Sequence, residues 1–319
     1  MSCENYLLKG IRSLNETQIM NGLELNLKTW LDWALLKVGG FTNIEGETEG
    51  INGGDWSILR LVKDPAYIEG RVWESAKKDW VWEGDITHID PDSAEEFSPL
   101  EVALYIDGSL VPDTDYIVNY PLGRIILDTA VDVESEVRAT YSFRQIQVYV
   151  ADQADWWNEL QFRSFNVEDS YFLQQDGGTW SIGAHHRIQM PCILIEAAPR
   201  TRSRGYQVGD GSFYLEQDVL CYVLAESRQS RNRIMDILRN QFDKNLQLFN
   251  VDNVALAGDF PLDYAGTLLD STKTFPVLSD AYPWKRCRFI RTDCTESMKV
   301  NPRLFSGLVR LTCEMIIDD

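Results

Sequence analysis

The clearest hydrophobic pattern in the chain runs from residue 212 to residue 242. Between 212 and 226, apolar residues occupy both alternating faces of a predicted strand, which is typical of an interior strand covered on both sides. Ser227 is suited to cap a following helix, whose apolar positions recur at helical spacing as Ile234, Ile237, Leu238 and Phe242. We therefore expect a central strand that passes directly into a helix lying back on its sheet.

The sequence around this unit favours a C-terminal α+β domain at residues 183–319. The polar stretch 199–211 is predicted to be a loop, and 251–284 is predicted to be irregular. Three more strands are predicted over residues 187–197, 285–294 and 304–317. Four strands covered by one helix indicate an α+β domain with a mainly antiparallel sheet.

Residues 55–182 contain many short strand patterns separated by Asp, Gly and Pro turns. Regular spacing of this kind predicts a small antiparallel β-sandwich or barrel. The predicted strands cover residues 56–62, 67–73, 79–83, 101–106, 116–120, 124–127 and 136–150. The segment 79–83 is expected to close a hairpin with 67–73, and a short helix is expected at 155–160.

The first 54 residues are predicted to form a helix and a loop. Ser13 and Glu16 have the spacing of a capping box, and a helix is expected from there to Val38. Its apolar residues lie on more than one side, so we expect it to contact more than one neighbour. The glycine-rich, acidic residues 43–54 are predicted to be a loop. The fold class of the whole chain is therefore α+β.

Charge divides the chain into two chemically different parts. The formal net charge is -19, yet residues 1–182 hold 32 acidic and 13 basic side chains, whereas residues 183–319 are balanced. Residues 83–136 carry 14 acidic side chains and a single basic one, Arg124. Because affinity for phosphate comes from Lys and Arg, we expect this part not to grip nucleic acid.

Cysteine usage and hydropathy bear on location. The six cysteines contain no CxxC pair, no signal peptide is recognisable, and no apolar run approaches the roughly 18 residues of a membrane helix. We expect free thiols in a reducing cytoplasm and no association with a membrane.

The motifs of common nucleotide-binding and hydrolytic enzymes are absent from the sequence, including both phosphate-binding glycine patterns and GxSxG. Adjacent His185 and His186 in a strand would point to opposite faces, so they do not readily share one metal ion. We expect no enzyme, no catalytic residue, no cofactor and no metal. A hydrolase that uses His185 or His186 is the alternative in this class.

Two groups of side chains allow a ligand-binding interpretation beside a structural one. Three tryptophans could form the sugar-stacking platform of a carbohydrate-binding module or the core of a hairpin: Trp73, Trp80 and Trp82. Five carboxylates resemble calcium ligands in type, although they lack EF-hand spacing and a solvated acidic loop also explains them: Asp85, Asp90, Asp92, Glu95 and Glu96.

Two groups of arginines are candidates for subunit contacts. In the polar loop, Arg200, Arg202 and Arg204 alternate, so an extended backbone would direct them to one side as a positive patch. In the helix after Ser227, three more arginines occupy the first turns, where the helix dipole disfavours cations: Arg228, Arg231 and Arg233. For each group two interpretations stay open: the arginines are exposed to solvent, or they contact another subunit or a partner protein.

Residues 187–196 and the strand-helix run 218–238 resemble the tail-terminator and neck proteins of tailed bacteriophages, in which a strand ending in Ala-Glu-Ser passes straight into a helix. Residues 103–108, 115–128 and 137–143 are similar to β modules common in phage virion proteins. The resemblance covers about two thirds of the chain and rests on pattern.

The resemblance implies a structural virion protein, most specifically a tail-terminator ring, in general a hexamer, that caps the tail tube and joins it to the head connector. Its implied partners are other copies of itself and the tail tube, sheath or head connector proteins. DNA would pass without specific binding, and the protein would be assembled into the virion in the host cytoplasm. A head-completion, connector or baseplate protein is the alternative within this group.

Overall fold

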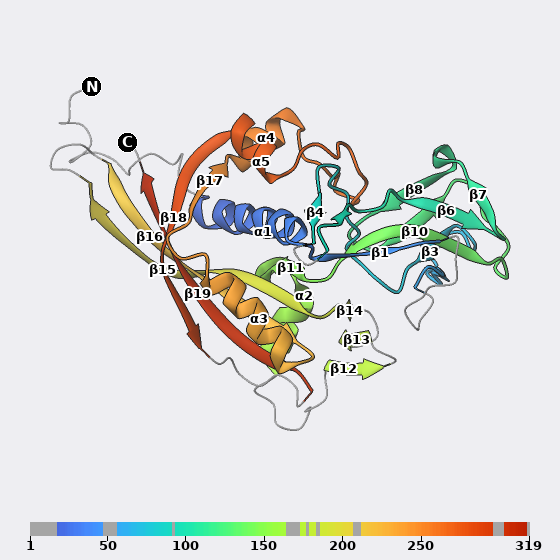
Figure 1. Cartoon of the computed structure of the whole chain (residues 1–319), viewed down its shortest axis with the longest axis horizontal. Helices are drawn as coiled ribbons and strands as arrows, with labels where there is room; N and C mark the ends of the chain where they lie inside the picture. The colour runs from blue at the N-terminus through green and yellow to red at the C-terminus, as the bar shows by residue number, and fades with distance from the viewer. Residues whose placement is uncertain are drawn as a thin grey trace.

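A long strand and the helix that follows it organise the computed structural model, as their hydrophobic pattern predicts. The structure describes residues 18–46, 56–90, 93–163, 173–176, 179–182, 186–206, 212–295 and 303–317. Over these residues it is an elongated α+β molecule, with a curled sheet and its helices at one end and a β module at the other (Figure 1).

The curled sheet has six strands in the order β11-β15-β16-β19-β18-β17. The bounds are β11 Gln147–Val150, β15 Cys192–Gly205, β16 Phe213–Ala225, β17 Asn245–Phe249, β18 Pro283–Thr295 and β19 Phe305–Ile317. All neighbours are antiparallel except β11, which runs parallel to β15. The predicted central strand is confirmed, because β16 pairs with β15 on one side and with β19 along its whole length on the other.

Several helices cover one face of this sheet. Val219, Cys221 and Val223 on β16 are buried there in one core with side chains of α1 (Ile19–Lys37) and α3 (Arg228–Arg239). The predicted cap is confirmed, since the Ser227 side chain accepts a hydrogen bond from the Ser230 amide. The Met235 side chain of α3 lies directly over Gly307 of β19, where a Cβ would displace the end of that side chain.

The predicted apolar stripe of α3 holds for three of its four members. Ile234 and Leu238 are buried, and Ile237 is partly buried against the same core. Phe242 is 60 % exposed, so its assignment to the stripe is wrong. The helix ends at Arg239, and Phe242 therefore lies beyond the last helical turn.

Helix α1 contacts two separate cores, as its apolar residues on several sides predict. Leu23, Leu27 and Leu31 belong to the core of the six-stranded sheet. Leu36, one turn beyond, packs instead with residues such as Phe41 at the base of the β module. The helix ends before Gly39 and Gly40 as expected, whereas the predicted capping box at Ser13 and Glu16 lies outside the described residues.

Asn26 fixes α1 to strand β17 through the backbone of Phe249. Its side chain is fully buried, and its Nδ2 donates to the Phe249 carbonyl at 3.0 Å, while the Phe249 amide donates to its Oδ1 at 2.8 Å. One amide side chain thus satisfies both backbone groups of a strand residue.

We expect Asn26→Leu to lower the free energy of unfolding by about 2–4 kcal/mol, because both Phe249 backbone groups lose a buried partner. Urea unfolding followed by far-UV circular dichroism measures the loss. Thr29→Ala is the control on the same helix, since the Thr29 hydroxyl donates to the Leu25 carbonyl within α1 itself. Equal losses in the two variants would contradict the stabilising role of the hydrogen bonds between Asn26 and Phe249.

The β module consists of two four-stranded antiparallel sheets, in the orders β1-β10-β6-β7 and β2-β3-β9-β8. Their bounds are β1 Phe41–Ile44, β2 Arg60–Leu61, β3 Val72–Glu74, β6 Ala103–Ile106, β7 Ser109–Val111, β8 Tyr116–Asn119, β9 Arg124–Leu127 and β10 Val137–Arg144. Leu104 and Tyr141 of the first sheet share a core with Trp73 and Ile125 of the second. The predicted sandwich is therefore present, with shorter strands than expected.

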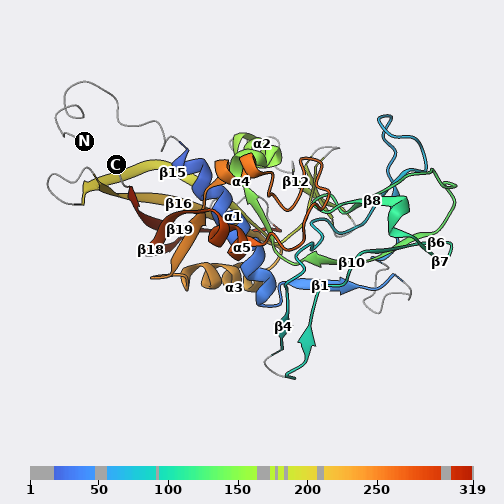
Figure 2. The same cartoon turned by 90° about the horizontal axis from the view of Figure 1, so that it is seen from above.

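A two-stranded hairpin, β4 (His88–Ile89) and β5 (Glu96–Phe97), projects from the middle of the molecule, as Figure 2 shows. The remaining elements are α2 Asp155–Arg163, β12 Leu173–Asp176, β13 Thr179–Ile182, β14 His186–Ile188, α4 Val251–Ala257, α5 Phe275–Ala281 and the single turns Asp113–Asp115 and Ala151–Gln153. Of these, the short helix near 155–160 was expected.

Several sequence expectations about strands are wrong. The stretch 136–150 is not one strand, because it breaks after Arg144 and sends β10 to the sandwich and β11 to the six-stranded sheet. The stretch 79–83 closes no hairpin with 67–73; β3 pairs with β9, and Trp80 bridges to Phe143. The polar stretch from 199 is not a loop at its start, since β15 continues to Gly205 across a bulge after Ala197.

Two further expectations failed in the C-terminal part. The stretch predicted to be irregular contains helices α4 and α5. The sheet has six strands where four were predicted, because β11 and the short β17 join it at its edges.

Packing crosses both of the expected domain boundaries. Helix α1, from the predicted segment 1–54, lies in the core of the C-terminal sheet, and β11, from the predicted β-rich part, is one of its strands. The division at residues 54 and 182 stays a prediction about independent folding units. The C-terminal sheet with its helices forms one lobe and the β module forms the other. Side chains of α1 pack against both lobes, and a cluster of buried charged side chains also joins them.

A buried ionic cluster joins the lobes. Arg144, at the end of β10, donates from Nη2 to both carboxylate oxygens of Glu83 at 2.7 and 2.8 Å, and its Nε lies 3.3 Å from Asp79. From α1, the Asp32 carbonyl accepts from Arg144, and the Asp32 carboxylate pairs with Lys28 at 2.6 Å. Burial raises the pKa of Asp79 to about 6 against the attraction of Arg144.

Candidate interaction surface

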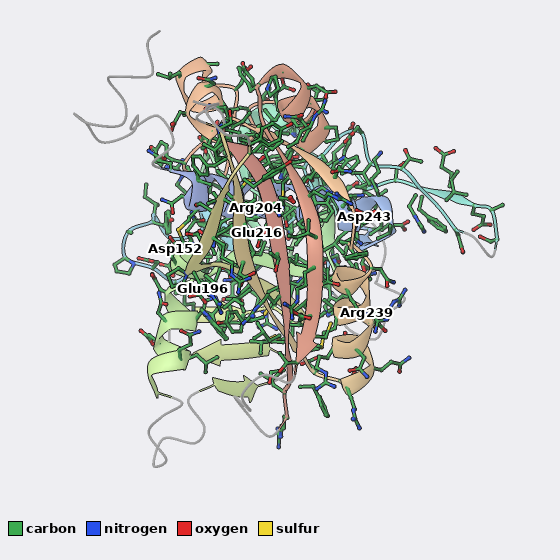
Figure 3. The ribbon with its side chains drawn as sticks, turned by 90° about the vertical axis from the view of Figure 1, so that its left-hand side faces the viewer. Asp152, Glu196, Arg204, Glu216, Arg239 and Asp243 are labelled. Atoms are coloured by element: carbon green, nitrogen blue, oxygen red, sulfur yellow. The ribbon has the colours of Figure 1, made fainter. Side chains whose placement is uncertain are left out.

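The face of the six-stranded sheet opposite α1 and α3 carries mostly polar side chains. Part of it is covered by α2, whose Trp156 and Trp157 pack with Leu194 and Leu224. The rest is open, and Figure 3 looks onto it, with Arg204 and Glu216 near its centre. Strand alternation places these open side chains on the face that the core side chains leave.

A groove of about 300 Å³ lies on this open face, and we call it the arginine groove. Four arginines and two carboxylates dominate its lining, which consists of Arg200, Arg202, Glu216, Asp218, Ile290, Arg291, Arg310 and Thr312. The groove therefore carries a net positive charge on a protein whose formal net charge is -19.

Partners within the chain account for some of these charges. Asp218 accepts a hydrogen bond from the Thr312 hydroxyl at 2.7 Å, and Arg291 pairs with Asp293 at 2.7 Å. Among the residues that the structure describes, the side chains of Arg200, Arg202 and Arg310 have no ion-pair or hydrogen-bond partner. Three guanidinium groups are thus open to an external acceptor.

Arg204 has a different environment from its two neighbours on β15. Its guanidinium lies 3.3 Å from Glu314 and 3.8 Å from Glu216, and it stacks over the Tyr214 ring at 4.7 Å. The alternation in the sequence predicted that the three arginines share one side and one role. The structure directs Arg200 and Arg202 to the groove and ties Arg204 to acids of its own sheet.

The arginines of α3 lie on the helix that covers the opposite face of the sheet. Arg228 and Arg233 are exposed, whereas Arg231 is half-buried and donates to the Ser306 carbonyl at 3.2 Å and to Asn232. The six predicted interface residues therefore form two groups on two sides of the sheet, and their role in contacts stays a prediction.

Sequence reasoning missed the arginines that complete the groove. Arg291 lies on β18 and Arg310 on β19, and both strands come far after β15 in the sequence. The register brings them near Arg202 through β16 and β19, where Arg310 faces Leu220 and Arg202 faces Glu216. A polar residue at every second strand position was the available signal, but it does not specify which strands are neighbours.

The other candidate residues do not converge on a site. Trp73 and Trp80 are 3 % and 0 % exposed, so these two rings are core and offer no platform to a sugar. His185 lies outside the described residues, and His88 contacts the Lys37 carbonyl through Nδ1 at 3.3 Å. Across the described ranges no three His, Cys, Asp or Glu side chains are placed to hold a metal ion; Asp92 falls outside them.

The cysteines that the structure describes are free, and all but Cys294 are buried. Burial raises the pKa of the Cys221 thiol to about 12, which leaves it protonated and unreactive at neutral pH. None of the helices in the described ranges has both the length and the apolar character needed to cross a membrane.

Neither the models of known protein families nor the curated protein sequences with which the chain was compared gave a match.

Proposed function

We propose that this chain is a structural subunit of a homo-oligomeric assembly, and that at its most specific it is a tail-terminator ring or another neck protein of a tailed bacteriophage. The observation that carries the assembly role is the arginine groove on the open sheet face. Arginine is enriched in protein interfaces, and guanidinium groups that find no partner in the described part of their own chain favour an acceptor on another surface.

The phage assignment rests on the resemblance of residues 187–196 and 218–238 to terminator and neck proteins. In this chain β16 is followed by α3 after two residues, and Ser227 caps the helix. We propose a ring that caps a tail tube and contacts the tube, sheath or head connector, with the acidic β module leaving DNA unbound as it passes. A head-completion, connector or baseplate subunit is the second form of the same proposal.

The purified full-length chain is expected to form rings with a central hole in negative-stain electron micrographs. Light scattering on the same sample gives the number of subunits. Incorporation of the labelled chain into phage tails separates a neck protein from other ring-forming proteins. A chain that stays monomeric at high concentration and enters no tail would refute the proposal.

A further inference from the structure

The hairpin β4–β5 touches the rest of its own chain through His88, which packs against Lys37 and Gly39, while Ile89, Glu96 and Phe97 are exposed. Cross-strand pairing sets Ile89 beside Glu96 on one face and Phe97 beside His88 on the other. Ile89 is 62 % exposed and Phe97 is 41 % exposed, so each face of the hairpin leaves an apolar side chain in solvent. Because an isolated two-stranded hairpin is marginally stable in water, a projecting hairpin of this kind favours a partner.

The hairpin is also acidic. Residues 88–97 contain four carboxylates and no Lys or Arg. Glu95 and Glu96 are exposed, and Asp90 closes the turn by accepting from the Ala94 amide through its carbonyl and from Ser93 through its carboxylate. The outward carboxylates of Glu95 and Glu96 are therefore accessible to a basic surface.

The arginine groove complements this hairpin, because it is positively charged and also has an apolar wall. It offers the guanidinium groups of Arg200, Arg202 and Arg310, and Ile290 supplies an apolar wall. Glu216 and Asp218 interrupt the positive lining, so the groove is not the continuous basic stripe that follows a nucleic-acid backbone. A protein segment that combines carboxylates with apolar side chains matches this mixed lining.

The hairpin and the groove of one chain face different directions. Figure 3 looks onto the sheet face that bears the groove, and the teal hairpin projects sideways from it. Figure 2 shows the same hairpin standing clear of the body. Contact between two different surfaces of identical chains is heterologous, and such contacts generate a ring when the rotation closes.

We infer that the β4–β5 hairpin of one copy binds in the arginine groove of a second copy, with the exposed carboxylates at its turn meeting the guanidinium groups of the groove. This inference rests on the proposed function, because it names the partner surface of the assembly proposed above. The contact is heterologous and repeats from copy to copy around the ring.

Charge reversal with rescue tests the contact in the full-length chain. The groove variant is Arg202→Glu/Arg310→Glu, and the hairpin variant is Glu95→Arg/Glu96→Arg. Each is expected to raise the dissociation constant for subunit association on the order of 100-fold, because like charges then meet across the interface. The chain that carries all four substitutions is expected to regain rings, since opposite charges face each other again. Sedimentation velocity measures association, and circular dichroism verifies that each variant is folded.

Two matched variants control for the change in net charge. Asp128→Arg/Glu134→Arg alters the exposed acids of the β module, and Arg60→Glu/Lys63→Glu alters exposed bases there. Both are expected to keep rings.

Three results would overturn the inference. The first is that rings persist in the groove or hairpin variant. The second is that the variant with all four substitutions stays monomeric. The third is that Asp128→Arg/Glu134→Arg alone loses rings. In each of these cases the wild-type ring leaves the proposed function standing, whereas a monomeric wild type overturns both. Binding of an oligonucleotide that only the groove variant loses, with rings unchanged, would assign the groove to nucleic acid.

Discussion

Replacing Arg144 by methionine is expected to lower the free energy of unfolding by about 3–5 kcal/mol, because it leaves a buried carboxylate without its partner. The side chains of Arg144 and Glu83 are 3 % and 2 % exposed. Both carboxylate oxygens of Glu83 accept from Arg144 Nη2, and Asp79 lies against the same guanidinium. Without it, the buried Glu83 carboxylate loses its ion-pair partner inside the junction between the lobes.

A surface ion pair provides the control for this experiment. Arg288 pairs with Asp243 at 2.6 Å, yet both side chains are more than half exposed. Arg288→Met is expected to lower the free energy of unfolding by less than about 1 kcal/mol, since water replaces the lost partner. Urea unfolding of the two variants measures both values. Equal losses would contradict the cost assigned to a buried carboxylate that has lost its partner.

A second substitution separates the cost of an orphaned charge from the value of the pair. The double variant Arg144→Met/Glu83→Met removes both members, and apolar side chains of similar volume replace them. We expect it to be more stable than Arg144→Met alone, because a buried ion pair contributes little net stability relative to apolar packing. A double variant as unstable as the single one would show that the whole cluster, including Asp79 and Asp32, depends on Arg144.

Replacing Trp80 by alanine is expected to lower the free energy of unfolding by about 3–5 kcal/mol, because it opens a large cavity in the sandwich core. The Trp80 side chain is fully buried and stacks on Tyr141 at 4.2 Å between ring centroids. Its indole Nε1 donates to the Lys77 carbonyl at 3.0 Å. The variant therefore loses apolar burial, ring stacking and one hydrogen bond together.

Thermal and urea unfolding of Trp80→Ala, Trp80→Phe and Trp82→Ala measure this effect. Trp80→Phe retains a stacked ring and is expected to lose less stability than Trp80→Ala. Trp82 is partly exposed, so Trp82→Ala is expected to cost less than Trp80→Ala. A greater loss from Trp82→Ala would mean that Trp82, rather than Trp80, anchors the sandwich.

Local chemistry made much of the fold predictable from the sequence. The strand β16 and helix α3 follow from a period of two, a serine cap and a helical apolar stripe, all of which act over a few residues. The turns of the sandwich follow in the same way. At Gly123, for example, φ is +62°, a backbone conformation that favours glycine in a tight turn.

The failed expectations involve contacts between distant residues. Nothing local separates β10 from β11, because residues 136–150 read as one long strand; the break places Arg144 against Glu83 and Asp32. The Phe249 backbone depends on Asn26, which lies 223 residues away. Such pairings depend on which elements become neighbours, and periodicity along the chain carries no information about that.

The candidate surface divides in the same way. By itself the sequence determined that arginines alternate along 200–204, that a helix starting after Ser227 carries three more, and that the acidic excess lies before residue 183. Only the tertiary structure decided that Arg200 and Arg202 meet Arg310 in one groove while Arg204 pairs with Glu314. Strand period sets the face on which a side chain lies, but the register between strands sets its neighbours, and register is a property of the folded sheet.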